Sequence, residues 1–202
     1  MSDDDLSVSW SRPPLPGDDL LILLHGFEGS EHDLDDRFPD LPRSVVTASL
    51  RAPVRQNAGH AWFLQDYGVR DAVDNVLAWL DTQSGFATVG VLGLSQGGAM
   101  ALELLRQAPE RFTYAVQLSG IILGLDAAPR LAKLRPPVFS GHGDLDEIVP
   151  KADVIATNEW LVTHTRLTVR DYVGMGHWIS AAEATDVCAF VRAVLVGHNP
   201  GT

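Results

Sequence analysis

The chain has 202 residues, a length typical of one folded domain, and we expect a single domain over residues 1–202. Hydrophobic residues make up 46% of the chain and charged residues 20%, a composition that excludes an intrinsically disordered protein. The formal net charge of −11 argues against nucleic acids and anionic membranes as binding partners, because like charges repel.

The first residues carry no signal for export. The start MSDDDLSVSW lacks the basic segment and the apolar run of a signal peptide. No apolar stretch of the chain approaches the roughly 18 residues that a membrane span needs. The single cysteine, Cys188, has no second cysteine with which to form an internal disulfide. These features predict a cytoplasmic protein with no stable membrane association.

Short apolar runs, separated by helical patterns, predict the secondary structure. An N-terminal strand is expected before the proline- and glycine-rich turn at residues 12–17. Near-continuous apolar runs, typical of parallel strands buried on both faces, cover residues 20–24, 44–50, 88–94, 114–118, 137–140 and 167–173. Apolar residues at three- and four-residue steps predict helices over residues 69–80 and 187–195.

This alternation of strands and helices predicts an α/β fold with a doubly wound, mostly parallel sheet flanked by helices. Ligands of such sheets bind outside the carboxyl ends of the strands. We therefore expect catalytic residues in the loops that directly follow strands.

The run Gly93-Leu94-Ser95-Gln96-Gly97 joins the strand at 88–94 to a helical pattern that opens at Gly98. A serine between a buried strand and a helix is typical of the nucleophile elbow, a sharp turn that lifts the hydroxyl out of the sheet. Glycines on both sides remove the side chains that would clash there. The alternative, a serine that caps the helix, does not account for the three glycines. The pattern predicts Ser95 as the nucleophile of a serine hydrolase.

A serine hydroxyl needs a general base held by an acid, and in this fold the chain order is serine, acid, histidine. The strand at 137–140 is followed by three carboxylates, Asp144, Asp146 and Glu147, and these remain alternatives for the acid. The strand at 167–173 is followed by Gly174-Met175-Gly176-His177, just ahead of the last helix. This position predicts His177 as the general base.

The charge that develops on the substrate carbonyl oxygen needs two preorganised backbone N–H donors. Gln96 directly follows the nucleophile and should supply one donor. The loop that starts at His25-Gly26, after the first core strand, should supply the other through the amide of Phe27.

No metal or cofactor is expected. His142, His164 and His198 are interpreted as structural or solvent-facing residues. The histidines are scattered and the cysteine is alone, so the clustered ligands of a metal site are missing from the sequence.

Seven segments in chain order support a more specific interpretation. They are Leu23-Leu24-His25-Gly26, Arg51-Ala52-Pro53, Trp62-Phe63, the run from Gly93 to Gly98, Leu118-Ser119-Gly120, the run from His142 to Pro150, and the run from Gly174 to His177. Together they resemble the phospholipase/carboxylesterase family of small α/β-hydrolases, which includes bacterial carboxylesterases and acyl-protein thioesterases. The resemblance covers most of the chain and implies the α/β-hydrolase fold without a large cap domain.

The resemblance also implies roles for individual residues. The family pattern around His142-Gly143 aligns Asp146, rather than Asp144, with the acid. It implies that Trp62 and Phe63 line the acyl pocket and that Trp178 joins them, although Trp62 and Phe63 are also interpretable as core aromatics. Glu28 departs from the family, which often has glycine at this position.

The function implied is hydrolysis of carboxylic esters of apolar acyl groups through Ser95, His177 and Asp146. An acyl-protein or acyl-CoA thioesterase and a lysophospholipase are the enzymatic alternatives. An inactive binding protein on a hydrolase scaffold is the non-enzymatic one. The partner expected is a small ester or thioester, and the chain is expected to be a monomer or a homodimer.

Overall fold

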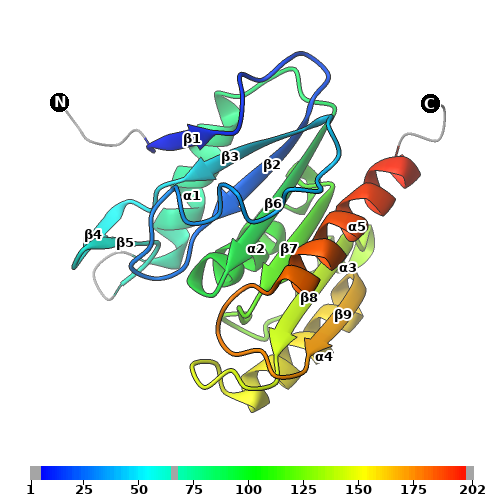
Figure 1. Cartoon of the computed structure of the whole chain (residues 1–202). Helices are drawn as coiled ribbons and strands as arrows, with labels where there is room; N and C mark the ends of the chain where they lie inside the picture. Colours follow the sequence, from blue (N-terminus) through cyan, green and yellow to red (C-terminus); the bar gives the residue numbers. More distant parts are fainter. Residues whose placement is uncertain (1–5, 65–67, 199–202) are drawn as a thin grey trace.

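A seven-stranded sheet forms the centre of the computed structural model, which describes residues 6–64 and 68–198 (Figure 1). The first strand in space runs antiparallel to its neighbour, and the other strands pair in parallel. In spatial order the strands are β1 (Val8–Trp10), β3 (Val45–Leu50), β2 (Asp19–Leu24), β6 (Thr88–Leu94), β7 (Tyr114–Leu118), β8 (Pro137–Gly143) and β9 (Arg166–Tyr172). A separate hairpin consists of β4 (Val54–Gln56) and β5 (Gly59–Ala61).

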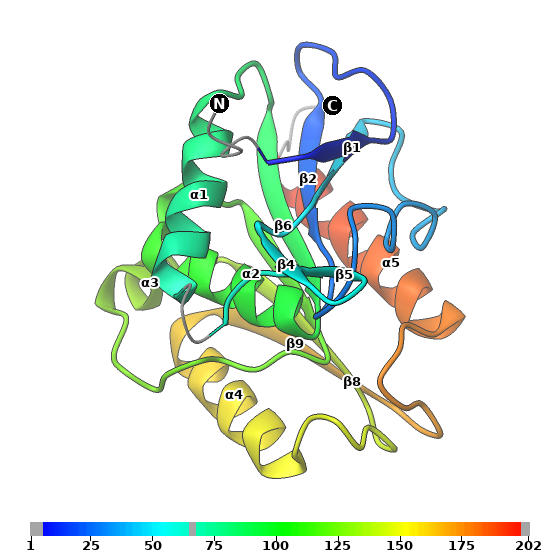
Figure 2. The same ribbon diagram turned by 90° about the vertical axis from the view of Figure 1, so that its left-hand side faces the viewer.

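Helices cover both faces of the sheet, as Figures 1 and 2 show together. One face carries α1 (Val69–Asp81), α2 (Gln96–Gln107), α3 (Pro129–Leu134) and α4 (Lys151–His164). A short 3-10 turn, η1 (Pro109–Arg111), follows α2. The opposite face carries α5 (Ala181–His198). None of the described helices is long and apolar enough to cross a membrane.

Each face of the sheet has its own hydrophobic core. Strand β2 shows the reason, because alternate side chains of a strand point to opposite faces. Its residues Leu20, Ile22 and Leu24 join the core under α1 and α2, whereas Leu21 and Leu23 join the core under α5. The predicted α/β-hydrolase architecture is confirmed, and the burial of both faces explains the apolar runs of the sequence.

Strand β8 is longer than the sequence predicts. It continues to Gly143 because it pairs along its whole length with β9, so that His142 lies opposite Asp171. The predicted strand, residues 137–140, ended three residues too early. Glycine and histidine interrupt the apolar pattern at the end of the strand, although the backbone there is still fully paired.

Candidate active site

Ser95 occupies a strained turn between β6 and α2. Its dihedral angles, φ 56° and ψ −117°, lie in a region that residues with a side chain rarely adopt. A Cβ atom at Gly93 would lie 2.0 Å from the carbonyl oxygen of Gly97, and one at Gly97 would lie 2.0 Å from that of Leu24. The turn therefore requires glycine on both sides. The Ser95 side chain makes no capping hydrogen bond to α2, so helix capping does not account for it.

His177 and Asp146 form a hydrogen-bonded pair at the carboxyl ends of β8 and β9. The Nδ1 of His177 lies 2.7 Å from the Oδ2 of Asp146. An ionised carboxylate accepts but does not donate, so Nδ1 carries the proton and Nε2 is the acceptor of the neutral ring. The other carboxylate oxygen accepts the amides of Ile148, at 2.9 Å, and Val149, at 3.1 Å.

The surroundings of Asp146 favour its charged form. Its side chain is completely buried, and burial by itself would raise the pKa. The hydrogen bonds from His177 and from the two backbone amides outweigh burial and hold the pKa of Asp146 below its ordinary value. The carboxylate is therefore ionised at neutral pH, as an acid that orients an imidazole must be.

The two other carboxylates of this loop point elsewhere. The Oδ1 of Asp144 accepts the amide of Gly174 at 2.6 Å, and the amide of Leu145 donates to the carbonyl of Met175 at 2.9 Å. These bonds tie the loop after β8 to the loop after β9. Glu147 is exposed and its side chain makes no hydrogen bond to any described residue. Of the three alternatives left by the sequence, Asp146 has the geometry of the acid.

The hydroxyl of Ser95 makes no hydrogen bond to His177 in the part of the chain that the structure describes. The two residues nevertheless share one edge of the sheet, because Ser95 follows β6 and His177 follows β9. The loop after β2 reaches the same place, since a Cβ atom at Gly26 would lie 3.6 Å from the Cβ of Ser95.

His25 fixes the start of that loop. Its Nδ1–H donates to the carbonyl of Gly26 at 2.7 Å, and its Nε2 accepts the amide of Ala52 at 3.0 Å. Burial lowers the pKa of His25, which keeps the ring neutral and able to make both bonds. The indole of Trp62 donates to the carbonyl of His25 at 2.8 Å.

The amides of Phe27 and Gln96 donate no hydrogen bond within residues 6–64 and 68–198. Gln96 is the first residue of α2, where backbone N–H groups have no partner inside the helix and favour negative charge. Neither amide is therefore engaged within the described residues, and their role as oxyanion donors stays a prediction.

The side chain of Gln96 has a role that the sequence did not indicate. Its Oε1 accepts the amide of Trp62 at 2.8 Å, and its Nε2 donates to the carbonyl of Phe63 at 2.9 Å. The segment after β5 is thereby attached to the turn at Ser95 and Gln96. No motif marks this pair of bonds, because it depends on how two distant loops meet.

The aromatic residues expected around the substrate have different surroundings. Trp62 has an exposed fraction of 0% and belongs to the core under α1 and α2, so it faces no open cavity. The alternative interpretation as a core aromatic describes it better. Phe63 is partly buried against the same core. Trp178 is 56% exposed beside His177, at the mouth of the candidate site.

The hairpin β4–β5 supports the turn that carries Phe27. Gly29 forms an isolated β-bridge with His60. The amide of His60 donates to the carbonyl of Gly29 at 2.9 Å. Glu28 has a φ of 60°, a left-handed conformation that favours glycine over a residue with a side chain. Its carboxylate points away from the core and accepts a hydrogen bond from Asn57.

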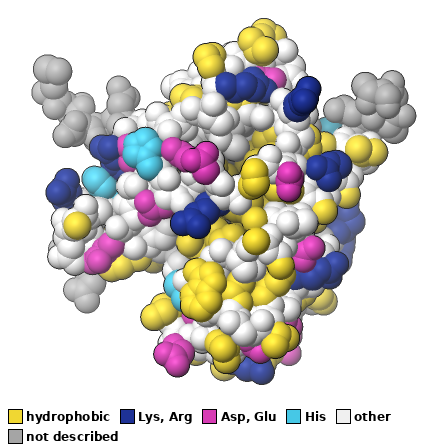
Figure 3. Space-filling view, in the orientation of Figure 1, with side chains coloured by type: hydrophobic (Ala, Val, Ile, Leu, Met, Phe, Trp, Pro, Cys, Tyr) yellow, Lys and Arg dark blue, Asp and Glu magenta, His cyan; other side chains and the backbone are white. Residues whose placement is uncertain are grey.

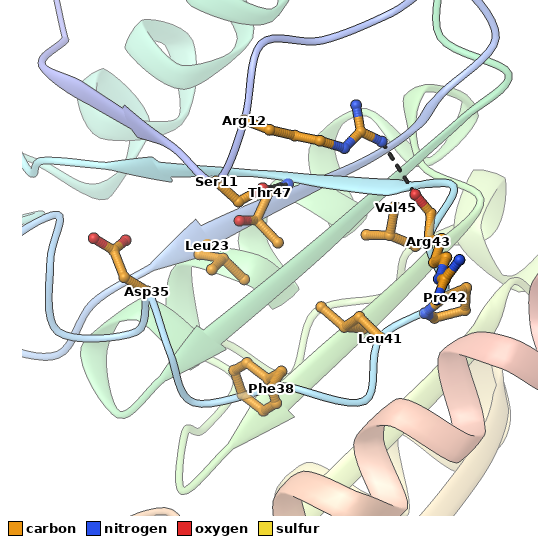
Figure 4. Close-up of a pocket in the computed structure, with 10 residues that line it drawn as sticks. All are labelled: Ser11, Arg12, Leu23, Asp35, Phe38, Leu41, Pro42, Arg43, Val45 and Thr47. Atoms are coloured by element: carbon orange, nitrogen blue, oxygen red, sulfur yellow. Dashed lines mark hydrogen bonds between the residues drawn. The ribbon is translucent and has the colours of Figure 1, made fainter.

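Hollows on the described part of the chain differ in chemistry and in their distance from the candidate site. A groove of about 480 Å³ is lined by Asp33, Leu34, Arg37, Leu94, His177, Trp178 and Ile179. A second cavity, of about 430 Å³, lies between β3 and residues 35–43 (Figure 4). The second contains no histidine, and its Arg12 is paired with Asp18. The groove beside His177 is therefore the substrate-binding candidate.

Among the residues that the structure describes, no three histidine, cysteine, aspartate or glutamate side chains are grouped so that they could hold a metal ion. His142 lies with its Nδ1 3.8 Å from the Oδ2 of Asp146, and burial lowers the pKa of its ring. Cys188 is buried on the inner side of α5.

Comparisons with known proteins identify the family of the chain. Residues 11–195 match the family model described as Phospholipase/Carboxylesterase. Acyl-protein thioesterase 1 of Eremothecium gossypii is 29% identical over 179 residues, which cover 81% of this chain and 75% of that protein. Esterase YpfH of Escherichia coli is 25% identical over 188 residues, which cover 83% of this chain and 79% of that protein.

Solved structures show the same fold. The crystal structure of esterase PE8 superposes with a TM-score of 0.76 at 25% identity, covering 94% of this chain and 99% of its own. The Bacillus cereus carboxylesterase superposes with a TM-score of 0.81 at 19% identity, covering 96% of each chain. The chain therefore belongs to the phospholipase/carboxylesterase family of α/β-hydrolases, whose named relatives are esterases and acyl-protein thioesterases.

Proposed function

We propose that this protein is a serine carboxylesterase that hydrolyses esters of apolar carboxylic acids through Ser95, His177 and Asp146. The observation that carries the proposal is the 2.7 Å hydrogen bond between His177 and the buried Asp146, at the sheet edge that holds the strained Ser95. A neutral imidazole oriented in this way is the base that a serine nucleophile requires.

The reaction has two steps. In the first, the Ser95 hydroxyl attacks the ester carbonyl carbon while the Nε2 of His177 takes its proton. The amides of Phe27 and Gln96 bind the oxyanion, and Asp146 stabilises the imidazolium. His177 then gives the proton to the leaving alcohol, which departs as the acyl-enzyme forms. In the second step, water attacks the acyl-enzyme in the same way and releases the acid.

The surface around the site supports an apolar acyl group. Exposed hydrophobic side chains surround the carboxyl edge of the sheet, among them Phe27, Leu145, Ile148 and Trp178. In Figure 3 hydrophobic side chains gather on the lower part of the face, over the loops that follow β8 and β9. Such a patch favours apolar ligands, because their burial removes hydrocarbon surface from water.

A fluorophosphonate probe tests the nucleophile. It should label the wild-type protein covalently and leave Ser95→Ala unlabelled, and Ser95→Ala should have no ester turnover above background. Labelling of the folded Ser95→Ala variant would assign the reactive group to another residue. Absence of labelling in wild type would favour an inactive binding protein on this scaffold.

The acid has a matched pair of variants. Asp146→Asn should lower kcat by about 10⁴-fold, because the asparagine amide favours the wrong histidine tautomer. Asp144→Asn lies two residues away and should lose less than about tenfold, since Asp144 contacts only the neighbouring loop. The opposite pattern would reassign the acid to Asp144.

Thioester hydrolysis is the second candidate, because one of the similar proteins is an acyl-protein thioesterase. Matched oxygen esters and thioesters of the same acyl group would separate the two activities. A kcat/KM that is at least about tenfold higher for the thioester would make this protein a thioesterase, since that ratio is about 1.4 kcal/mol of transition-state preference.

A further inference from the structure

Arg37 stands in the groove beside His177 without a carboxylate partner. Within the described residues, seven arginines form ion pairs with acidic side chains: Arg12, Arg51, Arg70, Arg106, Arg111, Arg130 and Arg170. Arg37 is not among them. Its one side-chain hydrogen bond is a long one, 3.4 Å from Nε to the backbone carbonyl of Asp33. Its terminal guanidinium nitrogens are therefore open to a ligand.

The backbone around Arg37 is held in place. Leu34 and Phe38, on either side of it, are 2% and 6% exposed and pack into the core under α5. The amide of Arg37 donates to the carbonyl of Leu34 at 3.3 Å, which closes a turn. The arginine is therefore carried on a fixed loop, although its side chain is exposed.

The acidic residue of the groove forms no ion pair with this cation. The carboxylate of Asp33 is turned back to Ser30, whose hydroxyl donates to Oδ1 at 2.7 Å and whose amide donates to Oδ2 at 3.2 Å. The remaining lining residues besides His177 are apolar: Leu34, Leu94, Trp178 and Ile179. An unpaired guanidinium in an apolar groove binds carboxylate or phosphate oxygens more strongly than it would in open water.

The position of the groove indicates which part of the substrate it receives. The imidazole of a serine hydrolase gives its proton to the leaving group, so the leaving group must lie next to the histidine. His177 is itself a wall of the groove. The groove is therefore on the leaving-group side of the bond that is cleaved.

We infer that Arg37 selects substrates whose leaving alcohol or thiol carries an anionic group, a carboxylate or a phosphate. This inference rests on the proposed esterase function and adds to it the charge of the substrate. The protein has a net charge of −11, which repels anionic substrates at long range, so a local cation is needed if they are to bind.

The test uses two butyrate esters that differ only in charge, 3-carboxyphenyl butyrate and 3-carbamoylphenyl butyrate. For each protein, kcat/KM for the charged ester is divided by kcat/KM for the neutral ester. At low salt this ratio should be about fivefold higher in wild type than in Arg37→Gln. Arg37→Lys should keep part of the preference, and Arg37→Glu should reverse it. High ionic strength should reduce the wild-type ratio, because salt screens the interaction.

Arg43→Gln is the matched control. Arg43 is another exposed arginine with no ion pair in the described chain, and it lines the separate cavity of Figure 4. Arg43→Gln removes the same charge from the protein as Arg37→Gln does. A general electrostatic effect would therefore change the ratio equally in both variants. An equal ratio in wild type, Arg37→Gln and Arg43→Gln, with the neutral ester still hydrolysed, would overturn the inference and leave the esterase function intact. If wild type hydrolyses neither ester and resists the fluorophosphonate probe, both proposals fail.

Discussion

Glu183→Gln should gain stability relative to wild type as the pH rises from 5 to 7. Glu183 lies in the first turn of α5 with an exposed fraction of 1%, and neither carboxylate oxygen has a hydrogen-bond partner. The side chain is pressed against β8, since a Cβ atom at Gly141 would lie 2.3 Å from its Oε1. Burial raises the pKa of Glu183 from 4.5 to about 8, and the charge of Asp186 adds to this.

The sign of the effect follows from the two pKa values. Between pH 4.5 and 8 the folded state keeps the proton of Glu183 and the unfolded state has lost it, so stability falls as the pH rises through this window. The penalty is about 3 kcal/mol at pH 7 and less than about 1 kcal/mol at pH 5. Glutamine titrates in neither state, and its unpaired amide affects stability equally at all pH values.

Urea unfolding of wild type and Glu183→Gln at pH 5, 6 and 7 measures this difference. The stability of the variant relative to wild type should rise by about 2 kcal/mol from pH 5 to pH 7. Glu159→Gln, on the exposed surface of α4, is the control, because it removes one carboxylate that is not buried. A constant difference between Glu183→Gln and wild type across this range would refute the reasoning, because it would mean that Glu183 ionises as readily in the folded protein as in the unfolded chain.

Two further variants test the support of the oxyanion turn. Gly59→Ala should lower kcat by about tenfold or more, because its Cβ atom would lie 1.9 Å from the carbonyl oxygen of Glu28 and displace the amide of Phe27. Full activity of this variant would show that the hairpin does not position the donor. Gln96→Met should reduce the free energy of unfolding by about 1–3 kcal/mol, because the amide of Trp62 and the carbonyl of Phe63 lose their partner. Urea unfolding measures this loss, and unchanged stability would mean that water satisfies both groups.

The sheet was predictable from the sequence because both of its faces are buried. The predicted bounds of β6 and β7, residues 88–94 and 114–118, coincide with those observed. Each apolar residue in these strands has a core to enter, whichever way it points. The end of β8 was missed because its pairing is made by the backbone, which leaves no trace in the hydrophobic pattern.

The sequence predicts those candidate site residues whose place is fixed by the end of a strand. Ser95 directly follows β6 and His177 lies in the loop after β9, so the order of strands and loops was enough to propose them. The choice of Asp146 over its neighbours is different, because it depends on loop hydrogen bonds that the residues alone do not specify. The burial of Trp62 and the lack of an ion pair at Arg37 were equally unpredictable from the sequence. Both arise from contacts between distant loops.

Backbone strain identifies the same site independently of any motif. Five described residues other than glycine have a positive φ, and four of them, Glu28, Asn57, Ser95 and Ser119, belong to Ser95's own turn or to loops near it. Each such conformation costs about 1–3 kcal/mol and persists only where neighbouring contacts impose it. Those contacts are present. The Asn57 side chain donates a hydrogen bond to the Glu28 carboxylate. The amide of Ser95 donates to the carbonyl of Leu118, and the amide of Ser119 donates to the carbonyl of Gly141. Packing elsewhere in the fold offsets this cost, which is the expected arrangement if the oxyanion donors and the nucleophile must be held in place before substrate arrives.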